Sequence, residues 1–128
     1  MLGVETLHHA SVSVSDLARA KRFYGDVLGL RELERPAFDF PGAWYELGDR
    51  HLHLIVHTSP RSLRGTTEID SRDGHFEVRV ASYQQTLEHL RGDGVPVLES
   101  PVNPTPWAQL YVTDPDGNVV ELNAERYE

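Results

Sequence analysis

The two halves of the chain repeat one order of secondary-structure signals, and this repeat constrains the fold more than any other feature. Residues 7–57 predict strand, helix and three further strands, and residues 74–123 predict the same order. An offset of 66 residues superimposes Val12 on Val78. Each half is too short to be a separate domain with its own hydrophobic core, so the repeat indicates two modules of one fold.

The predicted elements define the module boundaries. We expect an α+β protein with one domain over residues 1–128, in which a polar connector, residues 58–73, joins the modules 7–57 and 74–123. Each βαβββ module is expected to form a curled sheet with the helix on its outer face, and the two sheets are expected to share one cavity, which the residues below assign to a metal ion. The strands are predicted at residues 7–14, 30–34, 44–47, 51–57, 75–80, 95–99, 107–113 and 119–123. Helices are predicted at 17–28 and from 83 to the glycines at 92 and 94.

Four polar residues occupy matching places in the repeat. The first strands of the halves carry His9 and His75, and the last strands carry His53 and Glu121. The period of two in each strand places all four on the face opposite the aliphatic residues, toward the predicted cavity. Ordinary polar residues on an open sheet are the competing interpretation, but four groups at matched positions favour a metal site.

The residue types restrict the metal. The chain contains seven histidines and no cysteine, so any metal site has nitrogen and oxygen ligands. Three imidazoles and one carboxylate suit one borderline divalent ion, namely zinc, nickel, cobalt, iron or manganese. A five- or six-coordinate ion would keep an open position, as catalysis requires.

Charge and hydropathy exclude several partners. The formal net charge is −8, which argues against nucleic acid and anionic membranes. No apolar run is long enough for a transmembrane helix, and the N-terminal residues lack the pattern of a secretory signal. We therefore expect a cytoplasmic protein whose partner is a small molecule.

Three segments resemble the vicinal oxygen chelate superfamily, which includes glyoxalase I, extradiol dioxygenases and bleomycin resistance proteins. They are HHASVSVSDLARAKRFYGDVLGL (8–30), GHFEVRV (74–80) and DPDGNVVEL (114–122). The stretch 35–54 is similar to a glyoxalase-I-like subgroup. The resemblance implies that His9, His53, His75 and Glu121 hold the metal, and that the chain forms a homodimer with two sites.

The resemblance also implies a reaction type. A metal ion would bind adjacent oxygens of a small substrate and stabilise an enediolate or oxyanion, with Glu121 as ligand and general base. The expected protein is thus a glyoxalase-like lyase or isomerase. An extradiol-type dioxygenase, a thiol transferase and a non-enzymatic antibiotic-binding protein stay open as alternatives.

The chain departs from the glyoxalase I pattern at two positions. Members commonly place an arginine four residues after the first ligand and an asparagine four residues after the second, where this chain has Ser13 and His57. Both departures argue against glutathione as the thiol. His8 is expected to point to the helix side of the sheet and is left out of the ligand set.

Further side chains are candidates for the substrate pocket. The strand that carries His75 continues with Glu77 and Arg79 on the same face, and either an ion pair between these two or binding of a substrate anion by Arg79 would explain them. His51 and His57 are candidate groups beside the metal ligands. The predicted substrate-binding residues are Phe38, Phe40, Trp44, Arg79, Trp107 and Tyr111.

Overall fold

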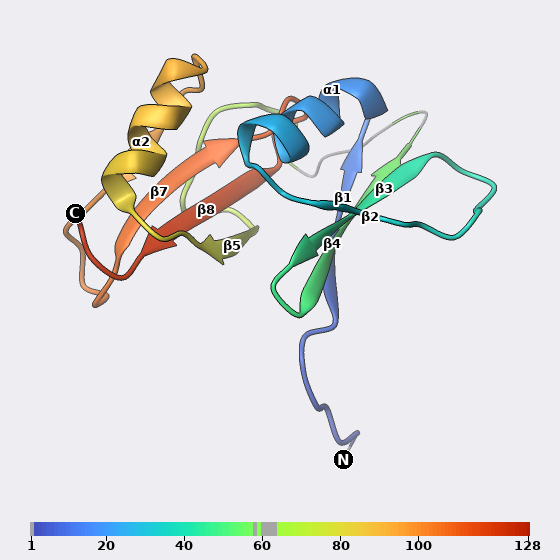
Figure 1. Ribbon diagram of the computed structural model, residues 1–128, viewed down its shortest axis with the longest axis horizontal. Coiled ribbons are helices and arrows are strands. Elements are labelled where there is room, and N and C mark those ends of the chain that lie inside the picture. Colours follow the sequence, from blue (N-terminus) through green and yellow to red (C-terminus); the bar gives the residue numbers. More distant parts are fainter. Residues whose placement is uncertain (1, 58, 60–63) are drawn as a thin grey trace. The chain divides into compact units, whose positions relative to one another are not determined.

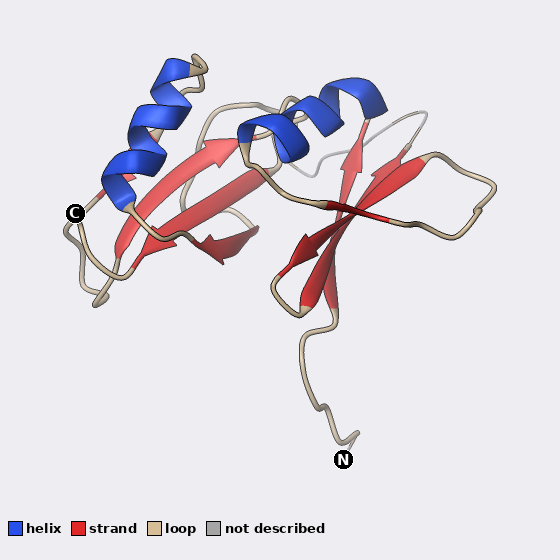
Figure 2. Ribbon diagram, viewed as in Figure 1, coloured by secondary structure: helices blue, strands red, loops and turns tan. Residues whose placement is uncertain are grey.

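The computed structural model describes residues 2–57, 59 and 64–128, so part of the predicted connector (58 and 60–63) lies outside the described residues. The chain divides into two compact units, Met1–Pro60 and Arg61–Glu128. The first unit contains β1 (His9–Val14), α1 (Leu17–Lys21), the π-helix η1 (Arg22–Val27), β2 (Glu32–Leu33), β3 (Gly42–Leu47) and β4 (Arg50–Val56) (Figure 1). The second contains β5 (His75–Arg79), α2 (Tyr83–Gly92), β6 (Leu98–Ser100), β7 (Ala108–Thr113) and β8 (Val119–Ala124) (Figure 2). This order confirms the α+β class and the two βαβββ modules.

The first unit is built on a sheet with the strand order β1-β4-β3-β2. β1 runs parallel to β4, whereas β3 runs antiparallel to both β4 and β2. Along β4, Leu52 and Leu54 are fully buried, and His51 and His53 occupy the alternate, half-buried positions. The period of two thus directs leucines to the core and histidines to the opposite face.

The helix of the first unit changes its hydrogen-bond pattern halfway. It begins after Asp16, whose carboxylate caps the first turn, as expected. Its last part is a π-helix, in which the Leu28 amide donates to the Phe23 carbonyl five residues earlier. The sequence predicts α-helix throughout, so this part of the prediction is wrong. The wider turn buries both Phe23 and its neighbour Tyr24, and Gly29, at a φ of +73°, ends the segment.

The second unit repeats this architecture with the order β5-β8-β7-β6, in which β5 and β8 are parallel. The Ser82 hydroxyl accepts a hydrogen bond from the Gln85 amide at the start of α2, which confirms the predicted cap. α2 packs against β7 (Figure 1). The buried apolar side chains of this unit come from α2, β7 and β8: Tyr83, Leu87, Leu90, Ala108, Leu110, Tyr111, Val112, Val119, Val120, Leu122 and Ala124.

The second strand of each module along the chain, β2 or β6, is shorter than the sequence predicts. β2 contains two residues and β6 three, against five predicted for each. Both lie at a sheet edge, where a strand has one neighbour and fewer hydrogen bonds to extend it. Among the helices that the structure describes, none is long and apolar enough to cross a membrane.

A buried arginine attaches the segment before β5 to the turn between β7 and β8. The Arg64 side chain is 8% exposed; its Nε donates to Asp73 (2.8 Å) and one terminal nitrogen donates to the Gly117 carbonyl (2.7 Å). The other terminal nitrogen donates to the Glu68 carbonyl. Gly117 has a φ of +88°, and a Cβ there would meet the Thr66 carbonyl oxygen, so the turn requires glycine.

Candidate metal centre

Three possible metal ligands lie together on the sheet of the second unit. Glu77 in β5 and Glu121 in β8 are direct neighbours across the two parallel strands. His75 precedes Glu77 by two residues and therefore lies on the same face of β5. One ligand atom from each of the three residues lies within 4.8 Å of the others, and the His75 Nε2 is 3.2 Å from a Glu121 oxygen.

The carboxylate of Glu121 is the buried centre of this cluster. Its residue is 3% exposed, whereas Glu77 is exposed. Burial would raise the pKa of Glu121, but hydrogen bonds with Glu77, Tyr111, Asn123 and His75 together hold that pKa below its usual value. The same Glu77–Glu121 hydrogen bond, followed by burial, raises the pKa of Glu77. As the pH rises, Glu121 therefore ionises first, and Glu77 is the carboxyl group of the pair that keeps its proton to the higher pH.

Two further side chains fix the position of the Glu121 carboxylate. Tyr111 in β7 lies directly opposite Glu121, and its hydroxyl donates to the carboxylate. Burial, together with this hydrogen bond, raises the pKa of Tyr111 to about 12, so its hydroxyl stays a donor at neutral pH. The Asn123 amide lies 3.4 Å from an oxygen of Glu77 and of Glu121, and its carbonyl oxygen accepts from Arg79 Nε at 2.5 Å.

Glu77 contacts Glu121 and Asn123 in the structure. An ion pair between Glu77 and Arg79 was expected as one option, but Arg79 bonds to Asn123, which separates it from the carboxylates. Sequence reasoning missed the contact between Glu77 and Glu121. Strand alternation places both carboxylates on one face of the sheet, but their direct contact depends on the register of β5 against β8.

The first unit positions two predicted ligands as a stack of rings. The His9 and His53 rings stack with their centroids 4.1 Å apart. Trp44 stacks on the other face of His53, with the ring centroids 4.2 Å apart and an angle of 4° between the ring planes. Burial, with the nearby charges of His9 and His51, lowers the pKa of His53 to about 4. His53 is therefore neutral at physiological pH, which is the form that ligates a metal.

The other predicted histidines of this unit make local contacts. His51 Nδ1 lies 3.4 Å from His53 Nε2, which places it beside the predicted ligand. His57 follows β4, and its Nδ1 accepts a hydrogen bond from the Ser59 amide. His8 precedes β1, so the alternation of the strand does not apply to it, and its Nδ1 lies 2.9 Å from that of His9.

The predicted pocket aromatics fall into separate groups. Phe38 and Phe40 lie in the exposed loop before β3, stack on each other, and both contact the Arg35 guanidinium. Phe38 also approaches Trp44, which continues the ring stack outward from His53. Trp107 belongs to the second unit, where it lines a pocket with Arg79.

The donors of the second-unit cluster fit a divalent ion. One imidazole and two carboxylates are the ligand types that zinc, iron, manganese and their neighbours accept. An ion between Glu77 and Glu121 would also offset the repulsion of two carboxylates on adjacent strands. Within the described residues, this is the one group of three or more such side chains close enough to share an ion.

Comparison with known proteins identifies one family. The description of that family is "Glyoxalase/Bleomycin resistance protein/Dioxygenase superfamily", and its profile matches residues 6–122. Glyoxylase I 4 of Arabidopsis thaliana is 28% identical over 124 residues, which cover 94% of this chain and 71% of that protein. Lactoylglutathione lyase of Escherichia coli O157:H7 is 28% identical over 125 residues, which cover 94% and 93%.

Solved structures share the fold at lower identity. A glyoxalase/dioxygenase from Nostoc punctiforme superimposes with a TM-score of 0.77 at 18% identity, over 95% of this chain and 92% of that one. A fosfomycin resistance protein from Listeria monocytogenes superimposes with a TM-score of 0.71 at 16% identity, over 94% and 93%. At these identities the likeness is one of fold, and it spans proteins with different named activities.

Proposed function

The chain belongs to the glyoxalase/bleomycin resistance protein/dioxygenase superfamily, and from that premise we propose that it is a metal-dependent lyase or isomerase of the glyoxalase type. Its substrate is a small molecule with two adjacent oxygen atoms. The observation that carries the proposal is the buried Glu121 carboxylate, whose pKa is lowered and which is held by hydrogen bonds with His75 and three other neighbours. The relatives named glyoxylase and lactoylglutathione lyase support the same reaction class.

The four predicted ligands fall into two pairs, one within each unit. His75 and Glu121 are the ligands in the second unit, and His9 and His53 are the predicted ligands in the first. When bound, a divalent ion would act as a Lewis acid that stabilises the negative charge of an enediolate or oxyanion. The four-ligand set stays a prediction, because the structure describes each pair within its own unit.

Glu121 is the candidate general base. A base must be ionised at working pH and must lie next to the reacting carbon. The lowered pKa of Glu121 meets the first requirement, and its place in the cluster with His75 and Glu77 would put it beside a substrate bound to a metal ion there. Tyr111 and Asn123 donate to the carboxylate and keep its oxygens in place.

The proposal is tested by restoring metal to chelator-treated protein. Zinc, nickel, cobalt, iron and manganese are added separately. The substrates are the adducts of methylglyoxal with glutathione and with smaller thiols, and their isomerisation is measured as the amount of thioester that forms. Glu121→Gln is expected to abolish turnover. The matched control is Glu88→Gln on the exposed face of α2, which removes the same charge from the same unit and should keep full activity.

The same preparations test the alternative activities. Oxygen consumption with catechols in the iron-loaded protein would replace the lyase proposal by an extradiol-type dioxygenase. Transfer of a thiol to an epoxide would replace it by a thiol transferase. A protein that binds none of the five metals and turns over none of these substrates would favour a binding protein.

The predicted homodimer is part of the proposal. β1 and β5 each form one edge of their own sheet, and sheet edges offer unpaired backbone groups to a neighbouring chain. Light scattering at micromolar concentration is expected to show twice the 14.4 kDa mass of the chain. A mass of one chain at that concentration would contradict the dimer and leave the metal proposal unaffected.

A further inference from the structure

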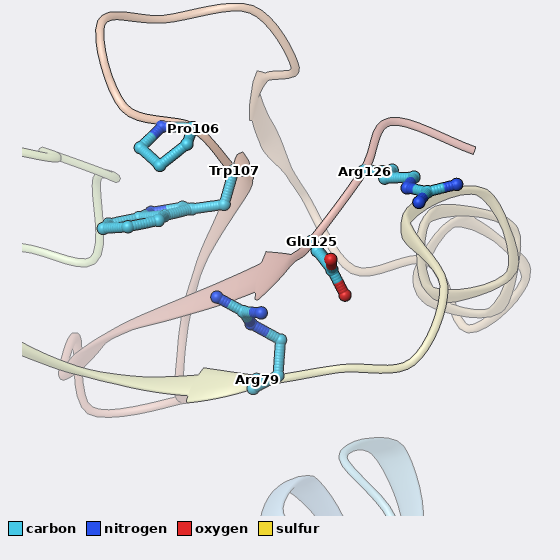
Figure 3. A pocket seen from close by; sticks show the side chains of 5 residues that line it. All are labelled: Arg79, Pro106, Trp107, Glu125 and Arg126. Carbon is cyan, nitrogen blue, oxygen red and sulfur yellow. The ribbon is translucent and has the colours of Figure 1, made fainter.

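A pocket of about 550 Å³ opens where β5 and β8 end together in the second unit. Figure 3 shows the five side chains that line it: Arg79, Pro106, Trp107, Glu125 and Arg126. Arg79 is the last residue of β5, and Glu125 directly follows β8. The pocket thus lies at one end of the strands that carry the candidate metal ligands.

The Arg79 side chain is held in a defined orientation within this pocket. Its Nε donates to the Asn123 carbonyl oxygen at 2.5 Å, and Asn123 is only 6% exposed. A guanidinium has five N–H donors, of which Nε uses one here, and the other four belong to the terminal nitrogens. Figure 3 shows the Arg79 side chain extending from β5 toward the other residues that line the pocket. A guanidinium fixed at Nε is preorganised for a planar, two-oxygen ligand.

Trp107 forms a rigid apolar wall of the pocket. Its carbonyl oxygen accepts hydrogen bonds from the side chains of Asn103 and Thr105, so the loop before β7 is tied at the tryptophan itself. The indole Nε1 is buried and has no hydrogen-bond partner among the described residues. Together with Pro106, the ring offers a surface for the carbon skeleton of a ligand.

The charges of the pocket favour a monoanion. Arg79 and Arg126 bring two positive charges and Glu125 one negative charge, which leaves a net charge of +1. This local sign is the opposite of the net charge of −8 on the whole chain. A net charge of +1 matches a carboxylate, and Glu125 would repel the second charge of a phosphate dianion.

The pocket and the candidate metal ligands share one strand face. His75, Glu77 and Arg79 alternate along β5 on the same side, so the Cα atoms of Glu77 and Arg79 are roughly 7 Å apart. Asn123 links the two sites, because it contacts both carboxylates and Arg79. We propose that the pocket binds a carboxylate group of the substrate, so that the substrate is an organic monoanion with a short carbon chain between its carboxylate and its chelating oxygens.

This substrate class rests on the proposed lyase function, but the carboxylate pocket is tested without metal or turnover. The chain has two tryptophans, so Trp44→Phe leaves Trp107 as the sole tryptophan, which is excited selectively over the tyrosines. Chelator-treated Trp44→Phe protein is titrated with phenylacetate and with phenylacetamide, its uncharged analogue of equal shape. We expect saturable quenching by phenylacetate and an affinity for the amide that is weaker by about tenfold, the cost of losing a charged hydrogen-bond partner.

Arginine variants locate the binding. In the Trp44→Phe background, Arg79→Gln should lower the affinity for phenylacetate by about tenfold or more, whereas Arg79→Lys should retain part of that affinity. The charge-matched control Arg72→Gln, in the exposed loop before β5, should leave the affinity unchanged. Glu125→Gln should strengthen binding, because it removes the negative charge of the pocket. Circular dichroism confirms that each variant is folded.

The outcomes separate the pocket from the reaction. Equal affinity for phenylacetate and phenylacetamide would overturn the proposal of a carboxylate pocket. An equal loss of affinity for phenylacetate in Arg79→Gln and Arg72→Gln would overturn it as well. Weaker binding in Glu125→Gln would also overturn it, since a zwitterion would then be the preferred ligand. Carboxylate binding in a protein that shows no turnover with any metal would keep the pocket and reject the proposed function.

Discussion

Replacement of Glu77 by Gln should stabilise the metal-free protein at neutral pH. Glu77 and Glu121 are direct cross-strand neighbours, and their ligand atoms lie within 4.8 Å. At that separation two full charges repel each other by about 3.5 kcal/mol at an effective dielectric constant of about 20. Glu77 is exposed, so water screens the repulsion, and we expect a gain of about 1 kcal/mol in the free energy of unfolding. Gln keeps an N–H donor for the Glu121 carboxylate.

The pH dependence of this effect has a definite sign. The pKa of Glu77 is raised by its hydrogen bond with Glu121 and by burial, so its proton stabilises the folded state below pH 4.5, and this contribution is lost as the pH rises through the raised pKa. Glu77→Gln should therefore gain stability over the native chain between pH 4.5 and pH 8. A divalent ion added to both proteins should reduce the difference in stability between Glu77→Gln and the native chain, because the ion neutralises the two carboxylates of the native chain.

Urea denaturation in the presence of a chelator, at pH 4 and at pH 8, measures the effect. Glu88→Gln on the exposed side of α2 is the control and should change the stability by less than about 0.5 kcal/mol at either pH. If Glu77→Gln is no more stable than the native chain at pH 8, then the two carboxylates do not repel each other as the structure indicates.

Three further substitutions test other parts of the structure. Tyr111→Phe removes one buried donor to Glu121 and should cost about 1–2 kcal/mol in urea denaturation, with a rise in the pKa of Glu121 visible by NMR titration. Gly117→Ala should cost at least about 2 kcal/mol by the same assay, because a side chain is strained at a φ of +88° and its Cβ would meet a backbone carbonyl. The backbone hydrogen bond from the next residue and the Arg64 side chain lower the pKa of Asp73 below 3.8, so its contribution is present above that pH and lost as the pH falls. In Asp73→Asn the free energy of unfolding should therefore fall less steeply as the pH is lowered into the acid range. An unchanged pH dependence would contradict the stabilising role given to the Asp73 carboxylate.

The repeat and the strand alternation predicted the architecture because both depend on local periodicity. The alternation of β4, with leucines facing the core and His51 and His53 on the other side, follows from the period of two alone. The π-helical part of the first helix could not be predicted in this way. The spacing of apolar residues indicates a helix, but it does not specify which carbonyl accepts each backbone hydrogen bond, and here the Leu28 amide donates to the Phe23 carbonyl.

The sequence predicted the candidate site only in part, because its key contact crosses two strands. His75 and Glu121 were predicted as neighbouring ligands, and they lie 3.2 Å apart. The contact of Glu77 with Glu121 depends on the register of β5 against β8, which alternation does not specify. Likewise, Asn123 was not singled out, although it joins Arg79 to both carboxylates.

Metal binding by the chelator-treated protein tests the central claim most directly. Calorimetric titration with zinc, nickel, cobalt, iron and manganese is performed on the native chain, on Glu121→Gln and on the control Glu88→Gln. The account predicts that the native chain and Glu88→Gln bind one divalent ion per chain with equal affinity, and that Glu121→Gln binds it at least about a hundredfold more weakly. A native chain that binds none of the five ions, or a Glu121→Gln protein that binds them with native affinity, would contradict it.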